Sequence, residues 1–357
     1  MDVMKTGLVL SGGGAKGAYQ VGVLKALHEA GARIDAVSGA SIGALNGGVL
    51  AAAPSLEVGI ERLSLLWERL AMQSPISANI PIYLSMLAAF GLRAQGGPAL
   101  LAALKLGQKA ADFFNIPWPQ TLASLDAGLL DDGPLKQLMD EFLRSEDLDR
   151  GLPLHVALYR SQGGIEDMLR IAAADLGIAD TPDSEFVHVQ SLPSAERKQV
   201  LLASAAIPLL FASRLHQGQR YSDGGQGGWQ TVQGNTPITP LLEAGCNLVI
   251  VTHLSQGSAW SRQRFPGATV LEIRPGRSLE RNEGLFAGPR DLLGFDAEKI
   301  PSWIEQGYQD TQRCVGRVLE AQQSRNTLRA SESRLSSVMR DAGDADDILA
   351  QAMKRLE

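Results

Sequence analysis

The sequence predicts an α/β fold in which helices cover a largely parallel β-sheet, and two observations predict it. In the first fifty residues, a short apolar stretch, a glycine-containing turn and a helix-compatible stretch follow one another twice. Short apolar stretches rich in β-branched residues return after residue 150. Parallel strands need long crossover connections, which are usually helices. This alternation is therefore typical of a parallel sheet with helices on its faces.

Each element is marked by its own pattern. Strands are expected at the short apolar stretches, which are residues 7–10, 36–38, 154–159, 186–189, 248–252 and 269–273. Helices are expected where apolar positions fit a helical period or the residues are small, at residues 16–30, 42–53, 56–72 and 134–143. Gly31 and Pro54 directly follow two of these helices, as helix-ending residues commonly do.

The domain organisation follows from two segments that differ from the rest. Residues 72–130 are helical in pattern without an obvious strand, so we expect a helical insertion in the α/β sheet there. Two interpretations of it stay open: extra packing layers, or a lid or cap. Residues 321–357 are polar and charged, which predicts a solvated helix or a flexible tail. Residues 1–320 are accordingly expected to form one domain.

The composition is that of an ordinary soluble globular protein. A net charge of −6 gives no electrostatic reason to expect a nucleic-acid partner. The most apolar stretch, residues 80–92, is shorter than the roughly 20 residues that span a bilayer. No signal-peptide pattern is present, and Cys246 and Cys314 are expected as free thiols in a reducing compartment. We therefore expect a cytoplasmic protein.

A candidate nucleophile lies in the motif Gly39-Ala40-Ser41-Ile42-Gly43, which fits G-x-S-x-G between a predicted strand and a predicted helix. The sharp turn at this place strains the serine backbone. Gly39 and Gly43 lack the Cβ atoms that would block the crossing of strand and helix. The helix N-terminus also places partial positive charge beside a developing alkoxide on Ser41.

A glycine-rich turn, Ser11-Gly12-Gly13-Gly14-Ala15-Lys16-Gly17, joins the first predicted strand to the first predicted helix. Successive glycines present several backbone N–H groups in one concave turn, which suits an oxyanion or a phosphate. We interpret Gly12, Gly13 and Gly14 as an oxyanion hole.

A dinucleotide site is the competing interpretation of this turn. Gly12, Gly14 and Gly17 satisfy G-x-G-x-x-G, the dinucleotide-binding fingerprint. The acidic residue that would bind the ribose is missing, however, because Asp35 precedes the second strand and does not end it. The P-loop spacing also fails, since Lys16 is followed by glycine where serine or threonine is required.

A serine nucleophile needs a partner that takes its proton. Four of the five histidines lie in helix or strand patterns or in a polar loop, namely His28, His155, His188 and His216. His253 directly follows the strand at 248–252, so it could reach the sheet edge beside Ser41. The other candidate is Asp223, held in a turn with Gly224 and Gly225. A carboxylate serves as the base when burial raises its pKa toward the working pH. Both candidates stay open on these grounds.

Together these segments resemble the patatin-like phospholipase family. The resemblance is carried by Gly12–Gly17, Gly39–Gly43 and Asp223–Gly225, with Ala203–Pro208 and Asn235–Ile238 as further similar segments, over about residues 5–255. It implies a three-layer α/β/α fold. It also implies a Ser41–Asp223 dyad without a catalytic histidine, and an oxyanion hole in the Gly12–Gly14 turn. The residues that would support this site are Lys16, Gly17, Gly39, Gly43, Gly224 and Gly225. Lys16 stands where the family often has arginine, so the charge is kept and the bidentate fork is lost.

The resemblance further implies hydrolysis of fatty-acyl esters of lipids, of the phospholipase A or lysophospholipase type, through an acyl-enzyme. It implies no metal and no cofactor, and a lipid acyl ester as the partner, reached in the cytoplasm or by peripheral contact with a membrane surface. Two other functions stay open: a Ser-His-Asp carboxylesterase or thioesterase that uses His253, and a nucleotide-binding protein that uses the glycine turn. An interaction protein with a degenerate site is disfavoured, because Ser41, Asp223 and the glycine turn are all present.

Overall fold

The computed structural model describes residues 5–72, 133–208, 210–279 and 295–318, with a few single positions beyond them. The chain divides into two compact units, Met1–Thr311 and Gln312–Glu357. Every strand and helix named below by a label belongs to the first unit. The helical insertion expected at 72–130 lies outside the described residues except for residue 72, and so does most of the tail expected at 321–357.

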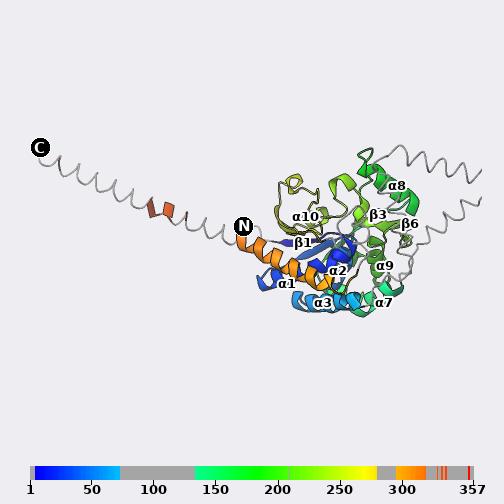
Figure 1. The fold of residues 1–357 in the computed structure, drawn as a ribbon, viewed down its shortest axis with the longest axis horizontal. Coiled ribbons are helices and arrows are strands. Elements are labelled where there is room, and N and C mark those ends of the chain that lie inside the picture. Colours follow the sequence, from blue (N-terminus) through cyan, green and yellow to red (C-terminus); the bar gives the residue numbers. More distant parts are fainter. Residues whose placement is uncertain are drawn as a thin grey trace, which may run out of the picture. The chain divides into compact units, whose positions relative to one another are not determined.

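An eight-stranded sheet forms the centre of the described part of the first unit (Figure 1). Its strands are β1 (Thr6–Leu10), β2 (Ala36–Gly39), β3 (Leu154–Arg160), β4 (Glu185–His188), β5 (Arg214–His216), β6 (Gln219–Asp223), β7 (Leu248–Thr252) and β8 (Thr269–Ile273). Their order is β5-β6-β3-β2-β1-β7-β8, and β4 also pairs with β3. The neighbours from β3 to β8 in this order are parallel, whereas β4, β5 and β6 pair antiparallel. The predicted α/β fold with a largely parallel sheet is confirmed.

Helices cover the sheet on both faces. They are α1 (Ala18–Glu29), α2 (Ile42–Ala51), α3 (Leu56–Met72), α7 (Gly133–Phe142), α8 (Gly164–Asp175), α9 (Ser194–Ser204) and α10 (Thr239–Glu243), and a further helix begins at residue 299. In Figure 1, α1, α2, α3, α7 and α9 lie on one side of the sheet and α10 lies on the other. This arrangement is the three-layer α/β/α architecture that the resemblance implies.

The core lies on both faces of the sheet, because successive residues of a strand point to opposite faces. The small helix α2 packs closely on one face, where a Cβ at Gly47 would lie 3.1 Å from the Leu154 side chain and 3.3 Å from Val37. The opposite face is covered by α10 and the segments around it. Its buried cluster consists of Val9, Ala36, Ile238, Leu241, Cys246, Val249, Val251 and Trp260.

Strand register brings two distant parts of the chain to the same level of the sheet. Gly39 pairs with Val156 in the parallel β2–β3 ladder. Leu158, two residues further along β3, pairs with Asp223 in the antiparallel β3–β6 ladder. The residue two positions after Gly39 is Ser41, so Ser41 and Asp223 leave the sheet at matching heights.

Two differences from the sequence-based expectations concern short elements. The first helix is preceded by a 3₁₀ turn at Gly14–Gly17 and begins at Ala18. No strand is predicted from the sequence at β5 or β6, because both are short and polar and lack an apolar stretch. These strands form by antiparallel pairing with each other and with β3, which is a contact between segments distant in the chain.

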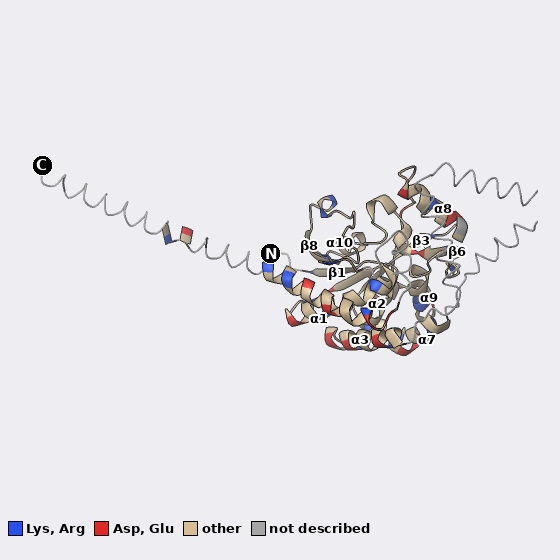
Figure 2. Cartoon of the chain, viewed as in Figure 1, with Lys and Arg blue, Asp and Glu red and all other residues tan. Residues whose placement is uncertain are grey.

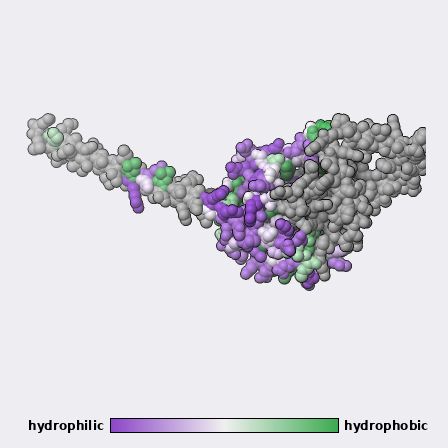
Figure 3. Space-filling view, viewed as in Figure 1, coloured by the Kyte–Doolittle hydropathy of each residue, from purple (hydrophilic) through white to green (hydrophobic). Residues whose placement is uncertain are grey.

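The surface of the first unit is mainly polar where it is described. Acidic residues recur along α3 and α7 (Figure 2). On the face drawn in Figure 3, most coloured residues are hydrophilic and hydrophobic residues gather in small areas. None of the described helices is both long enough and apolar enough to cross a bilayer.

Candidate active site

Ser41 occupies a sharp turn between β2 and α2. Its backbone has φ 54° and ψ −128°, a conformation that residues other than glycine rarely adopt. Such a conformation costs about 1–3 kcal/mol and persists only where the surroundings fix it. Ser41 is buried, with 7% of its surface exposed. This geometry is that of a nucleophile elbow, in which strand, strained serine and helix follow one another.

The two glycines of the motif permit the close packing of this turn. A Cβ at Gly39 would clash with the backbone carbonyl of Gly43. A Cβ at Gly43 would clash with the Leu10 carbonyl on β1. Both glycines are therefore required by close backbone approach, as expected for G-x-S-x-G.

Asp223 ends β6 and begins a tight 3₁₀ turn, Gly224–Gln226. Its carboxylate accepts a hydrogen bond from the Gly225 N–H at 2.8 Å. Its own N–H donates to the Ala206 carbonyl at 2.9 Å. A Cβ at Gly224 would clash with the Ala157 carbonyl, so the turn lies against β3 and needs glycine there. The carboxylate is thus held in one orientation without a histidine.

Burial changes the acidity of Asp223. Only 8% of the residue is exposed, and burial raises the pKa of its carboxyl from an ordinary 3.8 to about 6. The nearby Ser41 hydroxyl and the Gly225 N–H both favour the ionised carboxylate, which keeps the pKa of Asp223 from rising further. A carboxylate with this pKa is mostly ionised at pH 7 and is a stronger base than an exposed aspartate. The Ser41 hydroxyl and a suitable proton acceptor are therefore neighbours.

The glycine turn lies beside Ser41. A Cβ at Gly12 would come within 2.9 Å of the Ser41 Cβ. The Gly12 N–H donates to the Asn235 carbonyl at 3.2 Å, so this group is already engaged. Within the described residues, the N–H groups of Gly13 and Gly14 have no hydrogen-bond partner. These two N–H groups are therefore available to a ligand, while Gly12 allows the turn to approach Ser41 closely.

The other residues expected to support the site lie around the same turn. The Lys16 N–H donates to the Gly13 carbonyl at 3.3 Å, which closes the turn. Gly17 faces the first residue of α2, since a Cβ there would lie 2.6 Å from the Ile42 side chain. A Cβ at Gly225 would lie 3.0 Å from the Asp223 carboxylate. The expected site residues are therefore brought together around Ser41.

Ser204 and Asn235 have no role assigned from the sequence, yet both hold the site. The buried Ser204 hydroxyl accepts from the Ser41 N–H at 3.2 Å and donates to the Ala157 carbonyl at 2.7 Å. The Asn235 side chain lies between the two turns: its Nδ2 donates to the Gly12 carbonyl at 3.4 Å, and its Oδ1 would be 2.7 Å from a Cβ at Gly225. The sign in the sequence that could have pointed to Ser204 and Asn235 is that both lie in segments that resemble the patatin-like phospholipase family.

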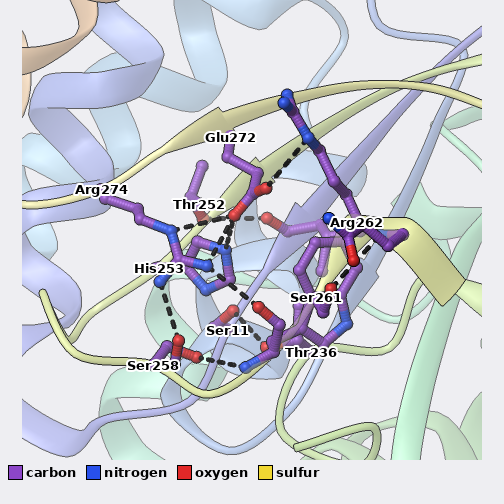
Figure 4. Close-up of polar contacts among 12 residues, drawn as sticks. Ser11, Thr236, Thr252, His253, Ser258, Ser261, Arg262, Glu272 and Arg274 are labelled. Carbon is purple, nitrogen blue, oxygen red and sulfur yellow. Dashed lines mark hydrogen bonds and ion pairs between the residues drawn. The ribbon is translucent and has the colours of Figure 1, made fainter.

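His253, the alternative base, is engaged elsewhere (Figure 4). Its Nε2 lies 3.2 Å from Glu272, which also accepts from Arg274 at 2.6 Å. The hydrogen bonds from His253 and Arg274 together lower the pKa of Glu272 to about 2, against the opposing effect of burial. Burial lowers the pKa of His253, of which 1% is exposed. Within the described residues no hydrogen bond joins His253 to Ser41.

Asp35 cannot serve a dinucleotide at the glycine turn. Its carboxylate accepts from the Thr6 N–H at 2.8 Å and from Arg33 at 3.1 Å. Thr6 begins β1, whereas the glycine turn follows the end of that strand, so the two lie at opposite ends of β1. Among the described residues no three His, Cys, Asp or Glu side chains group as a metal site needs.

Comparisons by sequence give one match over most of this chain and several short ones. A model of the family described as patatin-like phospholipase matches residues 8–242. The patatin-like phospholipase domain-containing protein ZK370.4 of Caenorhabditis elegans is 52% identical over 61 residues, which are 17% of this chain and 4% of that protein. Lysophospholipase nte1 of Aspergillus terreus is 64% identical over 45 residues, 13% of this chain and 3% of that protein. Neuropathy target esterase sws of Drosophila persimilis is 66% identical over 41 residues, which are 12% of this chain and 3% of that protein.

Solved structures are similar at lower identity. VipD from Legionella pneumophila is 17% identical with a TM-score of 0.42, covering 88% of this chain and 67% of that one. The ExoU–SpcU complex from Pseudomonas aeruginosa is 16% identical with a TM-score of 0.31, and the match covers 89% of this chain and 52% of that one.

The segments that match the curated relatives are only 3–4% of the lengths of those relatives. The family model, in contrast, spans more than half of this chain and includes both Ser41 and Asp223. The chain belongs to the patatin-like phospholipase family.

Proposed function

We propose that the protein hydrolyses fatty-acyl esters of lipids through a Ser41–Asp223 dyad, as a phospholipase A or lysophospholipase. The observation that supports this most directly is the pairing at the site. A serine in a strained turn lies next to a buried carboxylate whose pKa is raised to about 6. Activated serine nucleophiles need an adjacent base of this kind.

The first half of the reaction forms an acyl-enzyme. The Ser41 Oγ attacks the ester carbonyl carbon while Asp223 accepts the hydroxyl proton. The carbonyl oxygen becomes an oxyanion, which accepts hydrogen bonds from the Gly13 and Gly14 N–H groups. The tetrahedral intermediate then collapses, the ester C–O bond breaks, and the departing alcohol takes the proton from Asp223.

The second half regenerates the enzyme. Asp223 accepts a proton from a water molecule, whose oxygen attacks the acyl carbon. The same two N–H groups hold the second oxyanion. Collapse breaks the bond to the Ser41 Oγ, which recovers the proton from Asp223 and releases a fatty acid. No step requires a metal or a cofactor.

The substrate class is supported by the family and by the names of the short matches. The family is described as phospholipases, and one relative is named a lysophospholipase. We therefore expect phospholipids or lysophospholipids as substrates. Because such lipids reside in membranes and micelles, a cytoplasmic enzyme would meet them by peripheral contact with a lipid surface.

The experiment that tests the dyad is covalent labelling by a long-chain alkyl fluorophosphonate, read by intact mass. Wild type is expected to gain one adduct. Ser41→Ala should gain none, and Asp223→Asn should label about 10⁴-fold more slowly, because the base is lost. Ser302→Ala, which changes an exposed serine on the helix that begins at residue 299, is the matched control and should label like wild type.

Substrate assays then address the lipid. Phosphatidylcholine vesicles, lysophosphatidylcholine micelles and a triacylglycerol emulsion are compared by fatty-acid release. Release from either phospholipid form, lost in Ser41→Ala, supports the proposed class. Labelling at Ser41 with release only from the triacylglycerol would contradict the phospholipase assignment while keeping the nucleophile. An adduct that persists in Ser41→Ala would contradict the dyad itself.

A further inference from the structure

The proposed oxyanion donors, the Gly13 and Gly14 N–H groups, lie in a turn whose conformation its own side chains do not stabilise. Residues 12–14 are all glycine, so the turn has no side chains there with which to fix its own conformation. Oxyanion stabilisation nevertheless depends on N–H groups that are oriented before the reaction begins. The groups that fix the turn must therefore come from other elements.

A chain of buried side-chain hydrogen bonds reaches both ends of this turn. The Gln20 Nε2 donates to the Ser11 carbonyl at 2.8 Å. The Asn46 Nδ2 donates to the Gly17 carbonyl at 3.1 Å and to the Gln20 Oε1 at 2.8 Å. The Trp67 Nε1 donates to the Asn46 Oδ1 at 3.1 Å. Ser11 and Gly17 bracket the glycine turn, so one network holds its beginning and its end.

The direction of each hydrogen bond in this chain is fixed by its neighbours. The Ser11 and Gly17 carbonyls can only accept, and the Trp67 indole N–H can only donate. Gln20 must therefore turn its NH₂ group toward Ser11 and its oxygen toward Asn46. Asn46 must donate twice and accept once, which an aspartate, a leucine or a serine cannot do. Both amides have one suitable orientation.

Burial strengthens these hydrogen bonds. At most 1% of Gln20, Asn46 and Trp67 is exposed. Hydrogen bonds in such surroundings are stronger than in water, and unpartnered amides there are costly. The network is therefore stiff and responds as a unit.

The network also connects the turn to the nucleophile. Asn46 lies on α2, which starts directly after Ser41, and Gln20 lies on α1. Helices α1, α2 and α3 lie next to one another on the same side of the sheet (Figure 1). On the other side of the turn, the Gly12 N–H donates to the Asn235 carbonyl. The peptide between Ser11 and Gly12 is thus held from both of its edges.

We propose that Gln20 and Asn46 are positioning residues for the oxyanion hole, which hold the Gly13 and Gly14 N–H groups in register with the Ser41 Oγ. They do not touch the substrate and act through the backbone of the turn. The inference rests on the proposed function, since it assigns these residues to the transition state of ester hydrolysis. Their loss lowers kcat and leaves KM nearly unchanged, because the oxyanion exists only after attack.

The test uses Gln20→Met and Asn46→Leu, which keep size and remove the amide. Gln306→Met is the matched control, because Gln306 is also a buried glutamine, 7% exposed, whose Nε2 donates to a backbone carbonyl, that of Arg277, at 2.8 Å. Hydrolysis of a p-nitrophenyl acyl ester is measured well below each variant's Tm. We expect kcat to fall about 10–100-fold in the two site variants, with KM within about twofold. The control should lose stability but keep kcat.

A second readout isolates the oxyanion. An alkyl trifluoromethyl ketone adds the Ser41 Oγ to its carbonyl, Asp223 takes the proton, and the product is a hemiketal oxyanion held by the turn. Its inhibition constant should rise about 10–100-fold in Gln20→Met and not in Gln306→Met. The double variant of Gln20 and Asn46 should cost no more than the larger single change, because both act through the same turn.

The outcomes separate this inference from the proposed function. A wild type that neither hydrolyses the ester nor binds the ketone overturns both. An active wild type whose site variants keep kcat and ketone affinity, or whose control loses as much as they do, overturns the positioning role alone. If the site variants do not fold, Trp67→Phe keeps an aromatic ring and removes the indole N–H at the far end of the hydrogen-bond network, together with part of the ring volume. It should lower kcat by a smaller factor, and an unchanged kcat would contradict the inference.

Discussion

The two halves of the site are held by different chemistry. The glycine turn beside Ser41 is fixed by uncharged groups, the amides of Gln20 and Asn46 and the backbone of Asn235. The other half contains the titratable carboxylate of Asp223. A second buried carboxylate, Asp167, accepts a hydrogen bond from the neighbouring Ser222. The groups that fix the glycine turn therefore carry no charge, whereas Asp223 changes its charge as the pH changes.

The second carboxylate, Asp167, is joined by a hydrogen bond to Ser222, the residue before Asp223. Asp167 is fully buried and accepts hydrogen bonds from the Ser161 hydroxyl at 2.5 Å, the Gln162 N–H at 3.0 Å and the Ser222 hydroxyl at 3.2 Å. Ser222 directly precedes Asp223 and also accepts from the Gln226 Nε2 at 3.1 Å. Burial raises the pKa of Asp167, as it does for Asp223.

The two halves also differ in whether their buried polar atoms have hydrogen-bond partners. On the Ser41 side, both oxygens and the donors of Gln20 and Asn46 have partners. On the Asp223 side, the Gln226 Oε1 is buried without a partner among the described residues. Rigid donors suit the oxyanion, which needs fixed dipoles, while a proton-transferring carboxylate needs a tuned pKa. The comparison predicts that changes on the two sides differ in kind.

On the neutral side, the largest effect is expected at the closest contact. In Gly12→Ala, the new Cβ would lie 2.9 Å from the Ser41 Cβ and would clash with the Asn235 side chain. The turn must shift, so kcat should fall about 10²–10³-fold, as when an oxyanion donor is lost. Gly267→Ala is the control, because no atom lies within 4 Å of a Cβ there. Equal kcat in the two variants would show that the turn carries no oxyanion.

On the titratable side, Asp223→Asn should raise stability while it lowers activity about 10⁴-fold. The pKa of Asp223 is raised in the folded protein from 3.8 to about 6, so the folded protein binds this proton more tightly than the unfolded chain. The stability from that proton is complete below pH 3.8 and is lost as the pH rises past about 6. Ionised Asp223 at pH 8 thus costs about 3 kcal/mol.

Asparagine removes this cost and keeps an oxygen that can accept from the Gly225 N–H. Asp223→Asn should therefore be more stable than wild type by about 3 kcal/mol at pH 8 and by little at pH 4, measured by urea unfolding. The exposed change Glu61→Gln should shift stability little at either pH. A difference for Asp223→Asn that does not depend on pH would contradict a raised pKa.

Activity should fall in acid because the base must be ionised to accept the proton. With a pKa of about 6 for Asp223, kcat/KM should be constant above about pH 7 and decrease about 10-fold per pH unit below 6. The measurement is the rate of fluorophosphonate labelling between pH 4.5 and 9. Gln20→Met should lower the plateau without moving its midpoint, because its network carries no charge. A moved midpoint would mean that the two halves are coupled.

The sequence predicted those features whose cause is local. Ser41 and Asp223 stand in short motifs, and the strained turn and tight 3₁₀ turn follow from neighbouring glycines. The parallel strands are apolar because helices cover both of their faces. Strands β5 and β6 were not predicted, because they form by pairing with distant residues and have no apolar pattern.

The supporting residues could not be predicted for the same reason. Asn235 contacts Gly12 across more than two hundred positions of the chain, and Ser204 contacts Ser41 across 163. Gln20 and Asn46 stand in helices whose other residues are mostly apolar or small, and that contrast is the only local sign of them. Which backbone carbonyl a buried amide will meet depends on packing that the sequence does not display.

The smallest effect is expected at His253, and it tests which group is the base. Burial lowers the pKa of His253, so a histidine base would also give an acid limb near or below pH 6.5, and the pH profile alone cannot separate the two. His253→Gln keeps a donor that can reach Glu272, which limits disturbance of the neighbouring Leu254, whose side chain would contact a Cβ at Gly13. We expect kcat/KM within about threefold of wild type, because Asp223 remains, whereas loss of a general base costs about 10⁴-fold or more. A loss of that size in His253→Gln, with Asp223→Asn nearly active, would move the titratable half of the site from β6 to the end of β7.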